Sequence, residues 1–323
     1  MSSYTHFTTA ERETSMVMIR CGESIRSIAR KLERSPSSVS REIKRNKKKD
    51  GTYSASAAAT KYQHRRKSSG RKPKLDQNEE LRQYVEERLQ LSWSPDVIAG
   101  RMRLENRPFT LSYNSIYRAI DNGVLPKSLR LFLRFKRKKN RKKKSEDKRG
   151  KIQDAVSIRE RPQEANDRTE PGHFESDTVL GARRTGAIGT HVERKIGYLY
   201  AFKLADRRDN AYIYATADLV KKLPKILKKS FTVDHGSEFR DHQLLSELTG
   251  MNVYFCDPFS PWQRGSNENT NGLLRQFFPK GSSFADITDQ KLQEVVNLIN
   301  HRPRKRFGYR SPAELLDDLL CCT

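Results

Sequence analysis

Three acidic residues in the C-terminal half of the chain have the types and surroundings expected of a site for divalent metal. Asp177 lies in a strand-like run over 173–180, and Asp234 directly follows the short apolar run 231–233. A stretch of 33 residues separates Asp234 from Glu268, which lies among polar amides. Carboxylate oxygens are the ligands that hard cations such as Mg²⁺ prefer, and such cations promote phosphoryl transfer. We therefore expect Asp177, Asp234 and Glu268 to be metal ligands and catalytic residues.

Other carboxylates near these positions are alternatives of lower rank. Glu175 precedes Asp177 by two residues, so both side chains point to the same face of a strand, and Glu175 is a substitute or supporting ligand. Glu238 is expected to be an acid in the first turn of a helix, where the helix dipole favours negative charge. Asp257 precedes Pro258 at the end of a strand and is expected to be structural.

Three longer segments extend this pattern. They read P-F-S-P-W-Q-R-G-S-N-E-N-T-N-G-L-L-R-Q-F-F-P-K-G over 258–281, V-D-H-G-S-E-F from Val233, and N-H-R-P-R-K-R-F-G-Y-R-S-P-A-E over 300–314. With them the chain resembles the Asp-Asp-Glu transposases of bacterial insertion sequences, specifically the insertion-sequence-thirty family. Ser176 and His235 depart from the glycine and the asparagine that are usual in that family, but neither departure removes a carboxylate.

The resemblance implies a ribonuclease H-like integrase catalytic core in which the first and fourth strands are neighbours, so that Asp177 and Asp234 meet. It also implies binding of the terminal inverted repeats of an insertion sequence, followed by metal-dependent DNA cleavage and strand transfer. Two Mg²⁺ or Mn²⁺ ions are the implied cofactors. Double-stranded DNA, both element ends and target, is the implied partner, bound by a homodimer or higher oligomer.

Two other functions are alternatives to a transposase. One is a transposase-derived DNA-binding regulator without catalytic activity, which a broken set of carboxylates would favour. The other is a nuclease that lacks strand transfer and shares the same metal site.

Polar residues near Glu268 extend the expected site. Arg275 follows Glu268 by seven residues, two helical turns on and therefore on the same face, where it would contact the DNA backbone. Trp262 is expected to be a packing anchor. Asn267, Asn269 and Asn271 orient ligands or DNA, or cap the helix. The basic segment 302–306 contacts DNA or forms a solvated loop.

Positive charge is concentrated in the N-terminal half. The net charge is +25, and residues 1–150 hold 38 Lys and Arg against 16 Asp and Glu, whereas residues 151–323 hold 26 against 23. This asymmetry is expected if the N-terminal half binds a polyanion such as DNA. The alternative is that these charges form a solvated surface.

Residues 8–46 predict a helix-turn-helix within a DNA-binding domain over 1–50. Ser35 is a good N-cap and Pro36 suits the first position of the last helix, which buries Val39 and Ile43. A plain three-helix bundle is the alternative. The other face of this helix, which would enter the major groove, carries Ser37, Ser38, Ser40, Arg41, Lys44 and Arg45.

The remaining domains follow from shifts in composition. We expect a linker over 51–74 that contains a short helix, a second helix-turn-helix-like domain over 75–125, a basic linker over 126–168 and the catalytic domain over 169–323. In the second domain Trp93, Tyr113 and Tyr117 contact DNA or form core. The run R-F-K-R-K-K-N-R-K-K-K of the basic linker is expected to lie along phosphates.

The catalytic segment predicts a mixed α/β domain with a five-stranded sheet, because three strands are followed by alternating helices and strands. The predicted strands span 173–180, 188–194, 197–204, 230–233 and 251–256, and the predicted helices span 209–228, 237–249, 264–278 and 288–300.

The chain carries no apolar run of the ~20 residues that span a bilayer, and its four cysteines form no C-x-x-C pair. No signal peptide is visible at the start. We expect a soluble bacterial protein of the cytoplasm, associated with the nucleoid and with no membrane partner.

Overall fold

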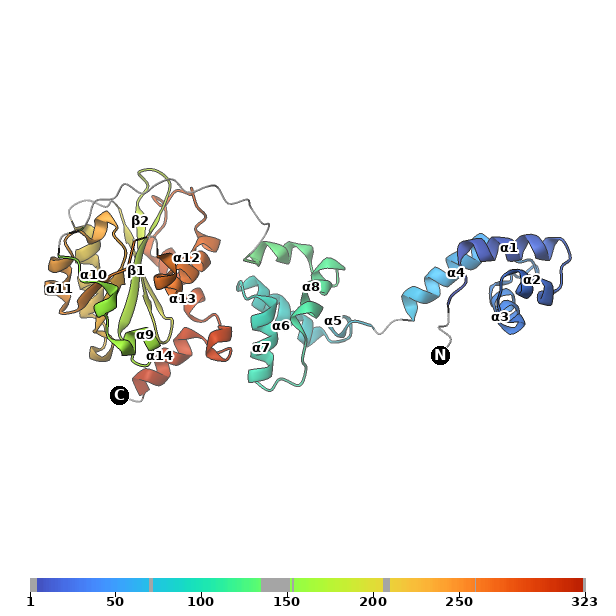
Figure 1. Ribbon diagram of the computed structural model, residues 1–323, viewed down its shortest axis with the longest axis horizontal. Coiled ribbons are helices and arrows are strands. Elements are labelled where there is room, and N and C mark those ends of the chain that lie inside the picture. Colours follow the sequence, from blue (N-terminus) through green and yellow to red (C-terminus); the bar gives the residue numbers. More distant parts are fainter. Residues whose placement is uncertain are drawn as a thin grey trace. The chain divides into compact units, whose positions relative to one another are not determined.

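Two compact units, Met1–Pro73 and Lys74–Thr323, make up the chain. The structure is a computed structural model that describes residues 5–69, 72–134, 152, 154–205, 210–258 and 260–321 (Figure 1). Among the helices of these residues, none is long and apolar enough to cross a membrane.

The N-terminal unit is a helix-turn-helix extended by a fourth helix. Thr8 and Glu11 form a capping box at the first helix. Ser24 caps the second helix and Ser35 caps the third, and each side chain accepts a hydrogen bond from a backbone amide of the helix that it caps. Pro36 takes the first position of the third helix, as predicted. The helices are α1 (Thr9–Arg20), α2 (Ile25–Lys31), α3 (Pro36–Asn46) and α4 (Ala55–Ser68).

The segment 51–74, expected to be a linker with a short helix, is largely helical and packed. Helix α4 runs for 14 residues, begins at the N-cap Ser54 and lies along α1. Tyr53 and Ala58 are buried in the core of this unit. Alanine-rich sequence favours a helix and allows close approach to α1, so the folded part of the N-terminal unit reaches Ser68.

Helices of residues 74–133 form a small bundle at the start of the second unit. Asn78, Ser94 and Ser112 cap its main helices. Its apolar core includes Leu129 of η1, so this part of the expected basic linker belongs to the bundle. The elements are α5 (Lys74–Gln77), α6 (Glu79–Gln90), α7 (Pro95–Leu104), α8 (Tyr113–Asp121) and the 3₁₀-helix η1 (Lys127–Phe132).

Aromatic residues of this bundle differ in burial. Trp93 is partly buried and packs against the core, whereas Tyr113 and Tyr117 on α8 are exposed. Of the three residues for which the sequence left core or DNA contact open, only Trp93 therefore belongs to the packed interior.

A mixed five-stranded sheet forms the centre of the C-terminal part, with the order β3-β2-β1-β4-β5. Strand β2 pairs antiparallel with β1 and β3, while β4 pairs parallel with β1 and β5. This is the ribonuclease H-like arrangement that the sequence predicted, with the first and fourth strands side by side. The strands are β1 (His173–Leu180), β2 (Ala187–Glu193), β3 (Leu199–Leu204), β4 (Ser230–Val233) and β5 (Asn252–Phe255).

Helices cover both faces of the sheet (Figure 1). Helices α10 (Ala211–Lys221) and α11 (His242–Thr249) pack over a core that includes Phe174 of β1. Helices α12 (Gly265–Phe277) and α13 (Asp289–Asn300) pack over a second core that includes Val179 of the same strand. Because successive strand residues point to opposite faces, β1 supplies both cores.

Other elements differ from the predicted ones. The helix expected over 209–228 ends at Lys221, since Pro224 disfavours helix at the preceding residue and only the short 3₁₀-helix η3 (Lys225–Leu227) follows. The helix expected over 237–249 is divided into the 3₁₀-helix η4 (Ser237–Phe239) and α11. Helix α14 (Pro312–Cys321) was not predicted.

Part of the expected basic linker packs on the sheet. Ile158 of η2 (Ile158–Glu160) and Ala165 of α9 (Gln163–Asp167) are buried, and the backbone amide of Phe255 in β5 donates to Val156 O. The basic run 135–151 lies outside the described residues.

Candidate active site

Two of the three predicted carboxylates lie on neighbouring strands at the same level. The parallel register pairs Glu175 of β1 with Thr232 of β4, so Asp177 and Asp234 come two residues further along their strands. Asp177 lies within β1 and Asp234 directly follows β4. The fold therefore brings together two aspartates that are 57 residues apart in sequence.

The guanidinium of Arg264 bridges these aspartates. Its Nη2 lies 2.8 Å from Asp234 Oδ2 and its Nη1 lies 3.5 Å from Asp177 Oδ1. Nη1 also donates to Ser176 O at 2.9 Å, and the Arg264 side chain is 14% exposed. Arg264 ends the 3₁₀-helix η5 (Pro261–Arg264), directly before α12. The carboxylates thus face one positive charge, as they would face a bound cation.

Backbone and amide donors fix the two carboxylates further. Asp177 accepts from the Thr178 amide at 2.9 Å and from Asn271 Nδ2 at 3.0 Å. Asp234 accepts from the Gly236 amide at 2.9 Å. Three different elements therefore hold the pair: the strands, the turn after β4 and α12.

Burial and charge compete at this pair. Burial raises the pKa of Asp177, the Arg264 charge opposes this rise, and the nearby Asp234 adds to it. Burial also works against the charge on Arg264, but Asp177 and Asp234 outweigh it and its pKa is raised. The guanidinium consequently stays charged, and its charge favours the ionised form of Asp177.

Glu268 lies on α12 with an exposed side chain. It precedes Asn271 by three residues on α12, so these two lie on one face of the helix, and Arg264 comes directly before the helix begins. In the part of the chain that the structure describes, no three His, Cys, Asp or Glu side chains gather closely enough to hold a metal ion. The structure therefore brings Asp177 and Asp234 together but does not bring Glu268 into a cluster with them.

The donor set around Asp177 fits a hard cation. The side-chain oxygen Oδ1 of Asn271 is buried without a hydrogen-bond partner, while Nδ2 of the same amide binds Asp177. An unpaired buried oxygen on an amide that contacts Asp177 is an acceptor that an oxygen-seeking cation such as Mg²⁺ would satisfy. Glu268 lies one helical turn from this amide.

Glu175, the alternative ligand, contacts other residues than the aspartate pair. Its side chain is fully buried, forms an ion pair with Arg194 and accepts from the Asn267 amide at 2.8 Å. Asn267 Nδ2 also donates to Glu175 O at 2.8 Å. Glu175 points to the same side of β1 as Asp177, as the alternation predicted, but there it anchors α12 to the strand.

The two residues that depart from the family pattern have structural partners. Ser176 Oγ lies 2.7 Å from His191 Nδ1, and His191 Nε2 lies 3.1 Å from Thr216 Oγ1, so a buried polar chain crosses from β1 through β2 to α10. The His235 ring packs against Phe255 with 5.5 Å between ring centroids. Neither side chain displaces a carboxylate.

The structure gives other predicted residues different surroundings. Arg275 Nη2 donates to Leu180 O at 2.7 Å, which ties α12 to the end of β1. Asn269 Oδ1 accepts from Arg134 Nη1 at 2.8 Å. Trp262 is 73% exposed, so the expectation of a packing anchor is wrong. Its place in the short η5 turn leaves the ring without a core to enter.

The basic segment 302–306 is only partly at the surface. Arg302 and Arg304 are buried, and burial lowers the pKa of Arg302 to about 10 and that of Arg304 to about 9. Lys305 and Arg306 are exposed. Of this segment, only these two can therefore meet DNA without rearrangement.

The face of α3 that was predicted to bind DNA is mostly open. Arg41, Lys44 and Arg45 are exposed, as is Ser37, whose carbonyl accepts from Arg41 Nε at 3.1 Å. Ser38 and Ser40 are half-buried, and Ser38 Oγ accepts from the N-cap hydroxyl of the same helix at 2.9 Å. Three cations and Ser37 thus remain accessible on one side of the helix.

Sequence reasoning missed the bridging role of Arg264. The spacing offered a signal, because the predicted helix over 264–278 places Arg264 four residues before the predicted ligand Glu268. The buried, unpaired Oδ1 of Asn271 could not be predicted from residue spacing, because it results from the packing of α12.

Comparisons with known proteins agree with these findings. A family model described as a helix-turn-helix domain matches residues 3–46. The transposase for insertion sequence element IS1086 of Cupriavidus metallidurans is 38% identical over 304 residues, covering 92% of this chain and 90% of that protein. The transposase InsI for insertion sequence element IS30C of Escherichia coli is 35% identical over 322 residues, covering 97% and 83%. The transposase for insertion sequence element IS4351 of Bacteroides fragilis is 33% identical over 321 residues, covering 98% and 96%.

Proposed function

The chain belongs to the IS30 family of insertion-sequence transposases, and from this premise we propose that it binds the terminal inverted repeats of its element and catalyses metal-dependent cleavage and strand transfer of their DNA. Its relatives are transposases and its N-terminal part is a helix-turn-helix, so it is a DNA-processing enzyme with a DNA-binding domain. The chemistry of the reaction and the residues that perform it are the content of the proposal.

One observation carries the proposed chemistry. Asp177 and Asp234 stand side by side on β1 and after β4, and both face the single cation of Arg264. Two carboxylates held side by side gather the negative charge that a divalent cation requires, and Arg264 supplies their counter-charge in the absence of such a cation. Asp177, Asp234 and Glu268 would hold two Mg²⁺ or Mn²⁺ ions, which supply an activated attacking oxygen and neutralise the leaving oxygen.

The residues around the pair prepare it for that role. Arg264 offsets the repulsion between Asp177 and Asp234, and the backbone amides at Thr178 and Gly236 hold one oxygen of each carboxylate in place. Asn271 holds the other oxygen of Asp177. Fixed ligand orientation lowers the reorganisation that cation binding would otherwise require.

Glu268 is proposed as the third ligand because of its place on α12. It shares a helical face with Asn271, which contacts Asp177, and it lies in the first turn of the helix that follows Arg264, which contacts both aspartates. Its exposed side chain has room to turn toward them when a cation or DNA arrives.

DNA recognition is proposed to rest on α3, whose N-terminal part would enter the major groove. Of the predicted contacts Ser37, Ser38, Ser40, Arg41, Lys44 and Arg45, those that are exposed would reach bases and phosphates directly. Arg275 is proposed to contact the DNA backbone near the aspartates, from its fixed position beside Leu180. Joining of two element ends in one complex further implies a dimer or higher oligomer on DNA.

The test is incubation of the purified chain with a labelled element end and Mg²⁺. The proposal predicts cleavage at the terminus of the repeat and joined products of higher length, both abolished when EDTA removes the metal. Cleavage without joined products would identify a nuclease instead. Binding to the ends without either product would identify a regulator.

A further inference from the structure

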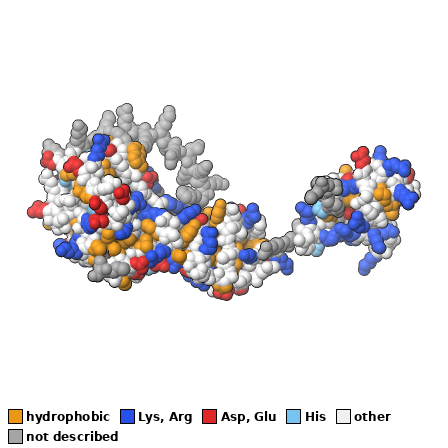
Figure 2. Space-filling model, turned by 60° about the horizontal axis from the view of Figure 1, so that its bottom comes forward, with side chains coloured by type: hydrophobic (Ala, Val, Ile, Leu, Met, Phe, Trp, Pro, Cys, Tyr) orange, Lys and Arg blue, Asp and Glu red, His pale blue; other side chains and the backbone are white. Residues whose placement is uncertain are grey.

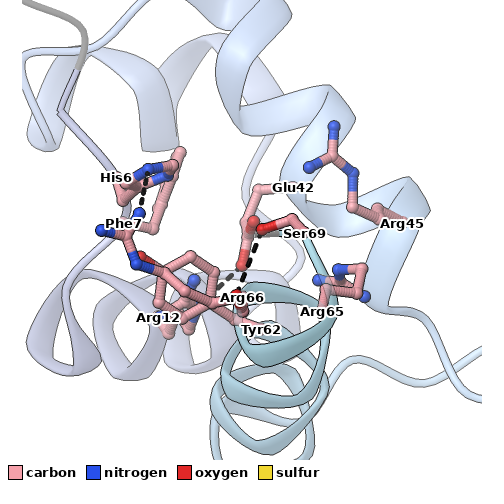
Figure 3. A pocket seen from close by; sticks show the side chains of 9 residues that line it. All are labelled: His6, Phe7, Arg12, Glu42, Arg45, Tyr62, Arg65, Arg66 and Ser69. Atoms are coloured by element: carbon pink, nitrogen blue, oxygen red, sulfur yellow. Dashed lines mark hydrogen bonds and ion pairs between the residues drawn. The ribbon is translucent and has the colours of Figure 1, made fainter. Parts of the chain in front are cut away.

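We propose that the cleft between α1, α3 and α4 binds a backbone phosphate of the DNA whose major groove receives α3. The cleft measures about 220 Å³ and lies within the N-terminal unit (Figure 3). This inference rests on the proposed DNA binding by α3 and adds to it a contact that lies outside the helix-turn-helix, on α4.

Four arginines and one glutamate line the cleft, among the residues that the structure describes there. Arg12 and Glu42 neutralise each other, since Arg12 Nε lies 2.8 Å from Glu42 Oε1 and their side chains are only 4% and 10% exposed. Arg45, Arg65 and Arg66 are left without a carboxylate in the lining. The cleft consequently holds an excess of positive charge that a bound anion would offset.

The partners of these arginines are neutral groups. Arg65 Nη2 donates to Asn46 Oδ1 at 2.8 Å, and Arg66 Nη1 lies 3.2 Å from His6 Nε2. Figure 3 shows Arg45 and Arg65 on one side of the cleft and Arg66 with His6 on the other. A guanidinium presents five N–H donors, so each arginine keeps donors for an anion while these contacts hold it in place.

The cleft adjoins the C-terminal end of the recognition helix. Arg45 lies in the last turn of α3 and Asn46 is its last residue. From α4, Lys61 Nζ donates to Asn46 O at 3.4 Å and to Lys47 O at 3.2 Å, so basic side chains of α4 cover this end. A helix C-terminus carries partial negative charge that would repel a phosphate, and these cations reverse the sign of the local field.

DNA is the source of the phosphate that this position favours. A helix in the major groove has a sugar-phosphate strand beside each end, and planar guanidinium groups match phosphate oxygens in pairs. Figure 2 shows many Lys and Arg side chains and few Asp and Glu side chains on the visible face of the N-terminal unit, as expected where a polyanion binds.

The experiment measures binding of the full chain to an element-end duplex and to an unrelated duplex by fluorescence anisotropy, across about 50 to 200 mM salt and without Mg²⁺. Each of the variants Arg65→Gln and Arg66→Gln should reduce the slope of log affinity against log salt by about 0.9, the value for one phosphate contact. The loss should be equal on both duplexes, because phosphates carry no sequence information.

Arg20→Gln is the matched control. Arg20 is an exposed arginine in the last turn of α1, eight residues or about 12 Å along the helix from Arg12. Its removal should leave the slope unchanged. Thermal unfolding of each variant shows whether it is folded. Arg65→Gln removes the hydrogen bond to Asn46 and can destabilise the unit. Arg66 is exposed, so Arg66→Gln tests the proposal without that effect.

Three results would overturn the proposal. One is an unchanged slope for Arg66→Gln, and another is an equal fall for Arg20→Gln. The third combines two observations: inorganic phosphate stabilises the wild type but not Arg66→Gln, and the salt slope for DNA is the same in both proteins. That result would identify the cleft as a site for a free anion and not for DNA. DNA binding is measured without metal, so it does not depend on cleavage or joining. If the proposed cleavage or joining fails, the binding measurement still tests the phosphate contact.

Discussion

The residue that most changes the picture of the site is Arg264, which takes the place between Asp177 and Asp234 that a cation would occupy. Two carboxylates at neighbouring strand ends repel each other, and a guanidinium that contacts both relieves this without metal. Arg264 therefore stabilises the site in the absence of metal, and it would compete with the proposed metal ions for the same oxygens.

Replacement of Arg264 separates these two effects. Without a cation, Arg264→Gln should lower the free energy of unfolding by about 1.5–3 kcal/mol, because the charged hydrogen bond to Asp234 and the ion pair with Asp177 are lost. Saturating Mn²⁺ should then raise the melting temperature of Arg264→Gln more than that of the wild type, since a ligand that binds only the folded state stabilises it and its competitor is gone.

Thermal unfolding with and without Mn²⁺ checks this, with Arg240→Gln, an exposed arginine after η4, as the control. An equal or smaller Mn²⁺ effect in Arg264→Gln would mean that the arginine does not occupy the cation position.

Residue types and spacing predicted much of this site but not its polar partners. The side shared by Glu175 and Asp177 follows from strand alternation, and the meeting of Asp177 with Asp234 was implied by the family resemblance. The ion pair between Glu175 and Arg194 could not be predicted from the sequence. It joins two residues that are 19 positions apart, one on β1 and the other directly after β2. The same pairing makes Glu175→Ala a poor activity control, since it would leave Arg194 buried and unpaired.

At the scale of elements, the sheet contains buried histidines that make stability depend on pH. Burial lowers the pKa of His173 to about 4 and that of His191 to about 3. An unfolded histidine titrates near 6.5, so between pH 6.5 and 4 the unfolded chain binds protons that the folded chain does not. Stability from these groups is complete above pH 6.5 and is lost as pH falls toward 4.

Urea unfolding at a series of pH values should show this loss as a slope of up to about 1.4 kcal/mol per pH unit for each histidine. His173→Gln should flatten the profile, because one of the proton-binding groups is removed. A profile of His173→Gln that coincides with the wild type would show that folding does not lower the pKa of this histidine.

Helices α7 and α14 join the bundle to the catalytic part of the second unit. Arg101 donates to both oxygens of Glu314, at 2.9 and 2.7 Å, and to Tyr309 O at 3.2 Å. Gly100 permits the approach, because a Cβ there would lie 2.2 Å from the Tyr309 ring. Hydrogen bonds from Arg101 lower the pKa of Glu314 to about 2.

A double-mutant cycle with Arg101→Ala and Glu314→Ala should give a coupling energy of about 1 kcal/mol, at the upper end for partly exposed pairs because the geometry is bidentate. The exposed pair Asp218 and Lys221 within α10 is the comparison, and should give about 0.5 kcal/mol or less. Coupling no larger than in that pair would show that the α7 to α14 contact does not stabilise the unit.

The success of element prediction depended on the strength of the periodic signal. Short apolar runs predicted all five strands to within two residues, since buried strands have few alternatives. Helix α4 lacks an apolar stripe and packs mainly through small residues, so its sequence resembled a linker. Helix α14 carried readable signals, including Ser311 and Glu314 in a capping box and Pro312 in the first position, and was missed as an element.

At the scale of the molecule, charge and chemistry are divided along the chain. Residues 1–150 carry nearly all of the excess positive charge, and the aspartate pair lies in the other half. This division could be predicted from composition alone. The boundaries could not, because residues 127–132 and 154–168, expected as parts of the basic linker, pack into the folded parts that flank the run 135–151. The division predicts that catalysis can be removed without loss of DNA binding.

The most direct test of the account compares carboxylate variants of the full chain on one labelled element end with Mg²⁺, measuring binding, cleavage and joining together. Asp177→Asn, Asp234→Asn and Glu268→Gln should each reduce cleavage and joining by at least about 100-fold, because each removes a charged ligand of the proposed ions. End binding should stay near the wild-type value. Glu247→Gln, at an exposed position of α11, should keep full activity. Wild-type cleavage by any of the three variants would contradict the assignment of that carboxylate, and wild-type cleavage by all three would place the catalytic site elsewhere.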